Sequence, residues 1–377
     1  MDFQLSDDQR AIADMAGSLF GDLCSDDRLR ASTTSGETWM ADLWAKCVET
    51  GLHALAIPEE AGGSGLGMTE LMLVLEAQGR GLGLVPLWRH QLAAAALTRF
   101  GGPAHQALIG QAVAGECLLS VALDSLASAS GVGLEARAEG DGFALHGRVP
   151  AVPLGMESAA VLLPVRTPEG LRVVVLRLDA PGVDKIAGVL THGEGAAELH
   201  CRGVLLSRAD LLPADTLAWL ESRSIAALAA LQLGVSAEQL RRTVAYVAER
   251  VQFERPIGSF QAVQMSLADA HMAIEALRST LWQLVYRLDA GLPAGPEALA
   301  TRYLACETGH LVGHRAQHVH GGIGVDLTYP IHRYLYWSRA LGLALGGSAA
   351  TLERLGDWLA HNDTLGWKYD LAEHPTL

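Results

Sequence analysis

The sequence predicts a mainly α, α+β chain in which a small β domain separates two helical domains. Helical periodicity dominates residues 1–115, short strand patterns bounded by turn residues dominate residues 116–213, and helical periodicity returns over residues 214–377. A chain of 377 residues is long enough for two or three domains with a large core. The expected order is therefore an N-terminal helical domain, a middle β-barrel or sandwich domain and a C-terminal four-helix bundle.

The N-terminal region carries clear helix signals. Ser6 precedes two aspartates, so its hydroxyl can cap a helix whose positive dipole end the two carboxylates favour. Apolar residues then recur three or four positions apart along one face: Ile12, Met15 and Leu19. We expect further helices over Trp39–Thr50 and Thr69–Gly79, separated by the glycine-rich link Gly62–Gly67.

The middle region carries strand and turn signals. Asp141-Gly142 is typical of a hairpin turn between Leu134–Ala138 and Phe143–Leu145. Two further apolar runs, Ala160–Leu163 and Leu171–Leu178, are separated by prolines and a glycine. These short runs predict a small β domain.

The C-terminal region returns to the helical period. Leu240, Val244, Val247 and Val251 step by four, three and four positions, which predicts one buried helical face. Later helices are expected over Phe260–Gly291, Pro296–His320 and Ser348–His361.

Composition excludes several classes of protein. The formal net charge is −14 and is spread along the chain, which disfavours nucleic-acid binding. The five cysteines form no Cys-x-x-Cys pair, so we expect reduced cysteines and assign no metal site. The acidic start excludes a signal peptide, and no apolar stretch is long enough to span a bilayer. We therefore expect a cytoplasmic protein without a membrane span.

Three segments carry recognisable motifs. The first comprises Gly51-Leu52, Ile57-Pro58-Glu59-Glu60 and Gly62-Gly63-Ser64-Gly65. The second comprises Glu249-Arg250, Phe253, Pro256-Ile257 and Phe260-Gln261. The third comprises His320-Gly321-Gly322-Ile323-Gly324 and Tyr329-Pro330. Together with an N-terminal helix of the same kind, these motifs make the chain resemble the acyl-CoA dehydrogenase family over nearly its whole length.

The resemblance implies FAD as the cofactor, with its flavin ring in one protomer and its ADP half against the C-terminal domain of the neighbour. On this chain it implies the following cofactor-binding residues: Arg250, Phe253, Gln261, His318, Gly321, Gly322 and Gly324. Arginine offers a planar fork of donors that suits a pyrophosphate, and glycines allow a ligand to approach the backbone. His318 departs from the glutamine that the family usually has there, but it retains hydrogen-bonding capacity.

The carboxylate base of that family is missing from both of its usual positions. The resemblance places these positions at Leu345 or Gly346 and at Ser224, none of which has a carboxylate. We therefore assign no catalytic residue. Glu221, one helical turn before Ser224, is a weak candidate for a displaced base, and Glu353 and Asp326 are weaker ones.

The flavin-ring segments also depart from the family. The positions of its "TEPxAGSD" loop and "WIT" triplet are occupied by Ala122–Ser130 and Ala151–Pro153. Loss of the base and the ring cradle together resembles the base-less subunits of heteromeric (α2β2) acyl-CoA dehydrogenases of steroid side-chain degradation. That likeness includes His318–Gly322, Tyr329–Tyr334 and Leu345–Gly347.

We therefore expect a subunit that completes the FAD site of a homologous catalytic partner, in an enzyme that desaturates a bulky acyl-CoA such as a steroid side-chain thioester. Electrons would pass to an electron-transfer flavoprotein or a similar acceptor. Three alternatives stay open: a self-sufficient homo-oligomeric dehydrogenase with a displaced base, a flavin monooxygenase of the same fold, and a structural partner without cofactor contact.

Overall fold

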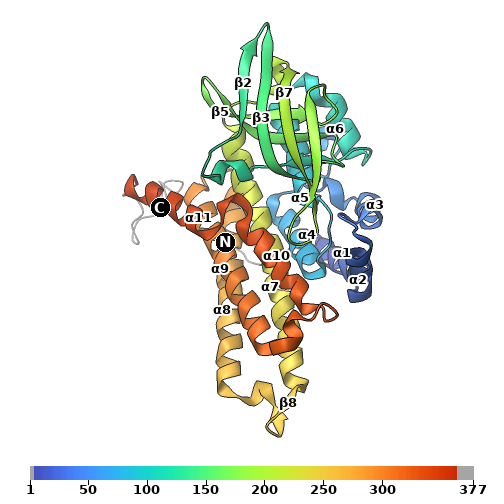
Figure 1. Ribbon diagram of the computed structural model, residues 1–377, viewed down its shortest axis with the longest axis vertical. Coiled ribbons are helices and arrows are strands. Elements are labelled where there is room, and N and C mark those ends of the chain that lie inside the picture. Colours follow the sequence, from blue (N-terminus) through green and yellow to red (C-terminus); the bar gives the residue numbers. More distant parts are fainter. Residues whose placement is uncertain (1–3, 363–377) are drawn as a thin grey trace.

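A computed structural model describes residues 4–362, and Figure 1 shows how its parts are arranged. The β domain lies at one end of the molecule, and long helices run from it toward the opposite end. A small hairpin, β8 (Val251–Gln252) with β9 (Arg255–Pro256), ends the molecule at the far side of the helices. The predicted fold class, helices on either side of a small β domain along the chain, is confirmed.

The N-terminal part is helical, as predicted. Its α-helices are α1 (Asp7–Leu23), α2 (Asp26–Ser35), α3 (Ala41–Glu49), α4 (Met68–Gly81), α5 (Leu87–Phe100) and α6 (Gln106–Val113). The predicted cap on α1 is present: the backbone N–H of Gln9 donates to Ser6 Oγ at 3.1 Å, and the Gln9 side chain accepts from the Ser6 N–H at 3.0 Å. These reciprocal bonds satisfy two backbone donors that the first turn leaves unpaired.

The middle part is a curled sheet with the strand order β1-β4-β2-β3-β7-β6, and β5 pairs with β4. The strands are β1 (Leu119–Val121), β2 (Leu134–Glu139), β3 (Gly142–Pro153), β4 (Ala160–Thr167), β5 (Gly170–Arg177), β6 (Val183–Val189) and β7 (Gly195–Leu206). The predicted hairpin exists, but Glu139 already pairs with Gly142, so the turn falls on Gly140 and Asp141. Strand β4 includes Pro164, which has no N–H to donate to a neighbouring strand. Its pairing with β1 ends at Leu162, so the missing N–H is tolerated there.

The C-terminal part is a helical bundle. It contains α7 (Thr216–Glu249), α8 (Gln261–Asp289), α9 (Gly295–His320), α10 (Ile331–Leu343) and α11 (Gly347–Ala360). Helix α10 was not predicted from the sequence. The predicted buried face near the end of α7 is confirmed in part: Val247 is buried and Leu240 packs partly buried against the core, but Val244 and Val251 are 47% and 53% exposed. That end of α7 extends past the bundle toward the hairpin, where fewer helices cover it (Figure 1).

Close contact between α4 and α7 joins the N-terminal helices to the bundle. A Cβ atom at Gly79 would lie 2.3 Å from the carbonyl oxygen of Leu231, and one at Gly234 would lie 2.0 Å from that of Glu76. Only glycine permits the two backbones to approach this closely. The N-terminal helices and the bundle consequently share one hydrophobic core, while the sheet has a second core of its own. Within residues 4–362, no helix is long and apolar enough to cross a membrane.

Candidate functional site

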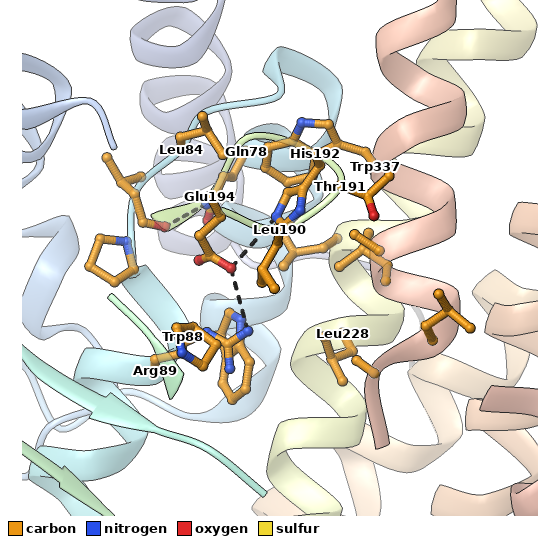
Figure 2. A pocket seen from close by; sticks show the side chains of 18 of the residues that line it. Gln78, Leu84, Trp88, Arg89, Leu190, Thr191, His192, Glu194, Leu228 and Trp337 are labelled. Atoms are coloured by element: carbon orange, nitrogen blue, oxygen red, sulfur yellow. Dashed lines mark hydrogen bonds and ion pairs between the residues drawn. The ribbon is translucent and has the colours of Figure 1, made fainter. Parts of the chain in front are cut away.

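A cavity of about 240 Å³ lies where the three parts of the chain meet (Figure 2). Its walls come from the α4–α5 connection, the end of β3, the β6–β7 loop, α7 and α10. Ala151 and Pro153, from the segment that resembles a degraded flavin-ring cradle, line it, and so do Leu343 and Ala344 just before the expected base position. The cavity thus occupies the place where the resemblance puts flavin and substrate.

Three ionisable side chains meet at the polar end of this cavity. The Glu194 carboxylate lies between Arg89 and His192, with its Oε2 3.7 Å from Arg89 Nη2 and 3.6 Å from His192 Nε2 (Figure 2). Arg89 also donates from Nη1 to the carbonyl oxygen of Val121 at 3.0 Å and stacks 4.3 Å from the centre of the Trp88 ring. A cation and a potential hydrogen-bond donor therefore face the Glu194 carboxylate.

His192 is the most constrained member of this trio. Its ring packs edge-on against Trp337 at 4.9 Å, and burial lowers the pKa of the imidazole. The ring is therefore neutral at neutral pH. Two buried nitrogens, His192 Nδ1 and Arg89 Nε, have no hydrogen-bond partner among the described residues. They leave donor or acceptor capacity in a region that otherwise carries mostly apolar side chains.

No motif in the sequence indicated Arg89, His192 or Glu194 as site residues. One signal was available, since three consecutive polar residues, Arg89-His90-Gln91, interrupt the apolar helix α5 and all are buried. Buried polar residues on a helix normally have a specific partner. Nothing comparable marks His192 and Glu194, which lie in a loop and become neighbours of α5 only through the fold.

The two expected base positions contain no proton acceptor. Ser224 on α7 is 1% exposed, and its Oγ has no hydrogen-bond partner among residues 4–362. Leu345 has a φ of 53°, and its N–H donates to Asp124 Oδ1 at 2.9 Å. A Cβ atom at Gly346 would lie 2.4 Å from the Ala127 Cβ, so this position has no room for a longer side chain. Both positions are built around residues without a carboxylate.

The weak alternative bases lie outside the cavity lining. Glu221 forms a two-pronged ion pair with Arg354 of α11, at 2.6 and 3.0 Å, which holds its carboxylate toward that helix. Asp326 accepts from the N–H and hydroxyl of Thr328, both at 2.8 Å, and these bonds lower the pKa of its carboxyl. Glu353 is exposed on α11. None of the three lines the cavity.

Three of the expected cofactor residues lie together at the far end of α7. Arg250 follows the last residue of the helix, is exposed, and its guanidinium makes no hydrogen bond or ion pair within the described part of the chain. Phe253, on the hairpin, is 85% exposed and packs edge-on against Phe260 at 6.0 Å. Gln261 is exposed at the first position of α8. A cation, an aromatic ring and an amide therefore face solvent side by side.

The other expected cofactor residues lie at the end of α9. His318 is exposed in the last turn, and Gly321 ends the helix with a φ of 63°. A Cβ atom at Gly321 or Gly322 would meet no atom within 4 Å, whereas one at Gly324 would lie 2.5 Å from Gln317 Oε1. Only Gly324 is thus required by contacts inside the chain, and the open side of the other two is free for a ligand or a second chain.

Stacked rings link the ends of α7 and α9. Tyr246, one turn before Arg250, stacks on His320 with ring centres 4.3 Å apart. The cavity lies far from this place, because Leu231 lines the cavity and Arg250 follows the end of the same helix. At 1.5 Å per residue, the two are separated by about 28 Å along the helix axis. The cavity and the exposed residues of one chain therefore belong to two separate places.

Two models of protein families match this chain. The model of the acyl-CoA dehydrogenase N-terminal domain matches residues 6–116, and that of the acyl-CoA dehydrogenase C-terminal domain matches residues 223–360. The chain therefore belongs to the acyl-CoA dehydrogenase family, whose members are oxidoreductases that act on CH–CH bonds.

Three relatives illustrate the degree of similarity. Acyl-CoA dehydrogenase FadE27 of Mycobacterium tuberculosis is 35% identical over 372 residues, covering 96% of this chain and 99% of that protein. A chain of the ChsE4-ChsE5 complex from the same species superposes with a TM-score of 0.91 at 35% identity, covering 96% and 100%. A chain from a variant of the Tcur3481-Tcur3483 steroid ACAD superposes with a TM-score of 0.88 at 38% identity, covering 94% and 98%.

Proposed function

We propose that this chain is the base-less subunit of a heteromeric, FAD-dependent acyl-CoA dehydrogenase, and that it completes the cofactor site of a catalytic partner. The observation that carries the proposal is the contrast between two places on the chain. The exposed end of α7 presents the Arg250 guanidinium, which has no partner within residues 4–362, and the hairpin that follows presents an exposed aromatic ring. At the cavity, the base positions Ser224 and Leu345 have no carboxylate.

The exposed residues suit the ADP half of FAD. Arg250 has a free fork of donors for a pyrophosphate, and Phe253 offers an uncovered ring for the adenine to stack upon. Gln261 and His318 supply hydrogen-bonding groups at the rim, and the open side of Gly321 and Gly322 allows a ligand to approach the backbone. Because these residues lie about 28 Å along α7 from the chain's own cavity, they would serve a cofactor whose ring lies in the neighbouring subunit.

The cavity of this chain is poorly suited to the oxidation itself. Desaturation requires a base for the α proton and an acceptor for the β hydrogen. Bound FAD supplies the hydride acceptor. Two carboxylates line it, and other groups engage both: Glu194 lies between Arg89 and His192, and Asp124 accepts from the Leu345 N–H at 2.9 Å. We therefore assign proton abstraction to the partner and cofactor binding to this chain.

Assembly with a homologous subunit is supported by the surface and by the relatives. Large apolar side chains are exposed on α8 and the hairpin: Met265 at 61%, Met272 at 61% and Phe253 at 85%. Exposed apolar groups of this size favour burial against another chain. One similar structure is named as the ChsE4-ChsE5 complex, and another is named as the Tcur3481-Tcur3483 steroid ACAD. We infer an α2β2 enzyme that acts on a bulky acyl-CoA such as a steroid side-chain thioester, with an electron-transfer flavoprotein or similar acceptor.

Glu194 favours a second candidate, a self-sufficient dehydrogenase with a displaced base. Its carboxylate is within the cavity, unlike that of Glu221. The two candidates differ in which single change abolishes activity.

Glu194→Gln and Glu221→Gln are expected to change the turnover of the assembled enzyme less than twofold. Each amide retains the size of the side chain and removes its ability to accept a proton, and neither residue is the base in the half-site account. Steady-state turnover of the two variants, at equal flavin content, measures this directly. A decrease of roughly a hundredfold or more in either variant would identify that residue as a displaced base.

Arg250→Ala is expected to weaken FAD binding by the assembled enzyme roughly tenfold to a hundredfold. The substitution removes charge-assisted hydrogen bonds to the pyrophosphate, each worth about 1.5–3 kcal/mol. Flavin absorbance after extensive dialysis provides the measurement. Arg202→Ala is the control, because Arg202 is an exposed arginine of the β domain that pairs with Asp184 at 3.1 Å. Equal flavin retention by the two variants would show that Arg250 does not contact the cofactor.

A further inference from the structure

A cavity of about 600 Å³ lies beside the one at the junction of the three parts. Its walls come from α2, the α4–α5 connection, the β6–β7 loop and the first turns of α10. The two cavities share one wall, whose residues are labelled in Figure 2: Leu84, Leu190, Thr191, His192 and Trp337. Sites for small organic molecules typically measure about 300–1,000 Å³, so this cavity is large enough for such a ligand.

Most of the wall of this cavity is apolar. Leu29 of α2, Leu82 of the α4–α5 connection and Trp337 of α10 line it and are buried. Leu327 and Thr34 also line it and are exposed, so the cavity opens to solvent on their side. The apolar part of a ligand that enters there would leave water, which favours binding by about 25 cal/mol per Å² of buried apolar surface.

Arg333 of α10 is the unusual polar residue of this wall. Two of its guanidinium nitrogens, Nε and Nη1, are buried and have no hydrogen-bond partner among residues 4–362. Burial lowers the pKa of this guanidinium, but arginine remains charged at neutral pH. Asp26, the carboxylate that favours its charged form, is engaged by Nη1 of Arg242 at 3.0 and 2.8 Å. Buried donors without an acceptor are costly, so a ligand that supplies the acceptor would be stabilised here.

The other ionised side chains of the wall are already paired. Glu37, the acidic residue of this cavity, accepts two hydrogen bonds from Arg28 at 2.7 and 3.0 Å. Arg30 lies on the exposed side, and its Nη1 is 3.4 Å from the carboxylate of Asp27. The unused charge of the cavity is therefore positive and belongs to Arg333.

We propose that this cavity binds an organic carboxylate with a large apolar body, and that Arg333 binds the carboxylate. A guanidinium suits the two oxygens of a carboxylate, and one unused charge matches a singly charged head group better than a phosphate. A fatty acid and a polycyclic acid share this chemistry and differ in the shape of the apolar body.

This ligand differs from the substrate of the proposed reaction, because a thioester has no charged carboxylate to meet Arg333. The site also requires neither FAD nor a partner subunit, since none of the proposed flavin contacts lines it. The inference therefore goes beyond the proposed function and can fail or succeed independently of it.

Isothermal titration of the full chain with dodecanoate and with cholate, each below the concentration at which it forms micelles, tests the proposal. We expect at least one probe to bind, and Arg333→Gln to weaken that binding roughly tenfold or more. Arg333→Lys retains the charge but loses the fork, so it should bind with intermediate affinity. The neutral methyl ester of the bound probe should bind as weakly as the acid binds to Arg333→Gln.

Arg89→Gln controls for the neighbouring cavity. Arg89 is also a buried arginine, but it lines only the cavity at the junction, whereas Arg333 lines only this one. We expect Arg89→Gln to leave the affinity for the probe unchanged. A loss of affinity in Arg89→Gln but not in Arg333→Gln would place the ligand in the other cavity and overturn the proposal.

Leu327→Asp tests the site without removing a buried group. Leu327 is 65% exposed, and an aspartate there would repel the carboxylate of the ligand or pair with Arg333 in its place. We expect binding to weaken roughly tenfold or more. Leu205→Asp is the matched control, because Leu205 is 74% exposed on β7 and lines neither cavity.

The comparison of probes identifies the kind of acid. Tighter binding of cholate than of dodecanoate supports a polycyclic acid, and the reverse supports a fatty acid. Lack of binding of both probes up to about 1 mM, or equal affinities in Leu327→Asp and Leu205→Asp, would overturn the proposal. Both aspartates replace exposed residues, so this outcome remains decisive even if the Arg333 variants fold poorly.

Discussion

The purified chain, without a partner subunit, is expected to show no measurable acyl-CoA dehydrogenase turnover. Both base positions lack a carboxylate, and the two carboxylates that line the cavity are engaged, Glu194 by Arg89 and His192 and Asp124 by the Leu345 N–H. A positioned base contributes roughly 10²–10⁴-fold to proton transfer. Reduction of an artificial electron acceptor by acyl-CoA, with added FAD, provides the assay. Normal turnover of homogeneous chain would contradict the expectation.

A variant separates loss of the base from loss of the flavin-ring site. Ser224→Glu introduces a carboxylate at the position on α7 where the family resemblance expects one. Because FAD would not be held in this chain's cavity, we expect the variant to remain inactive. Ser224→Gln, with an equal volume, controls for disturbance of a position that is 1% exposed. Turnover restored by glutamate but not by glutamine would indicate a functional ring site in this chain.

Arg302→Ala is expected to lower the free energy of unfolding by about 3–5 kcal/mol. Arg302 of α9 is 1% exposed, and its Nη2 donates to the carbonyl oxygens of Leu341 at 2.7 Å and Gly342 at 3.2 Å, and to that of Ala344. The alanine leaves these carbonyls unpaired and opens a cavity in the core. Urea denaturation of the two proteins provides the measurement.

The control for this variant lies on the same helix. Arg315 pairs with Asp269 at 3.9 Å, and its side chain is 41% exposed. An exposed pair of this length contributes little, so Arg315→Ala should change the free energy of unfolding by no more than about 0.5 kcal/mol. Equal effects of the two variants would show that Arg302 does not hold the α10–α11 junction.

The α10–α11 junction contains Leu345 and Gly346, the expected base position that has no carboxylate. Arg302 binds the carbonyls that precede Leu345, and Asp124 accepts from the Leu345 N–H at 2.9 Å. Leu345 itself is 7% exposed and has a left-handed backbone. Residues of α9 and of the β domain therefore hold the backbone of this segment in place, although the segment carries no carboxylate that could accept a proton.

Local patterns predicted many of the regular elements, although α2, α5, α6, β1, β6 and β7 were not individually predicted. The cap at Ser6, helices α3, α4, α8, α9 and α11, and the β2–β3 hairpin all follow from spacing and turn residues. Helix α10 was not predicted because Tyr329-Pro330, His332 and Arg333 were interpreted as part of a family motif and not as a helix. The buried face expected at the end of α7 was wrong at Val244 and Val251, because periodicity indicates an apolar stripe but not what covers it.

The candidate site was predictable only in part. Arg250, Phe253 and Gln261 lie within a dozen residues of one another, so a motif could group them. Arg89 and Glu194 are more than a hundred residues apart, and only the packing of the β6–β7 loop against α5 brings them together.

Flavin counting on the assembled enzyme tests the central claim most directly. The chain would be co-expressed with a homologous dehydrogenase subunit, and FAD released by denaturation would be compared with the amounts of the two chains. The half-site account predicts one FAD for each pair of unlike subunits, with occupancy lowered by Arg250→Ala in this chain. One FAD for every chain, or stoichiometric FAD on this chain purified alone, would contradict it.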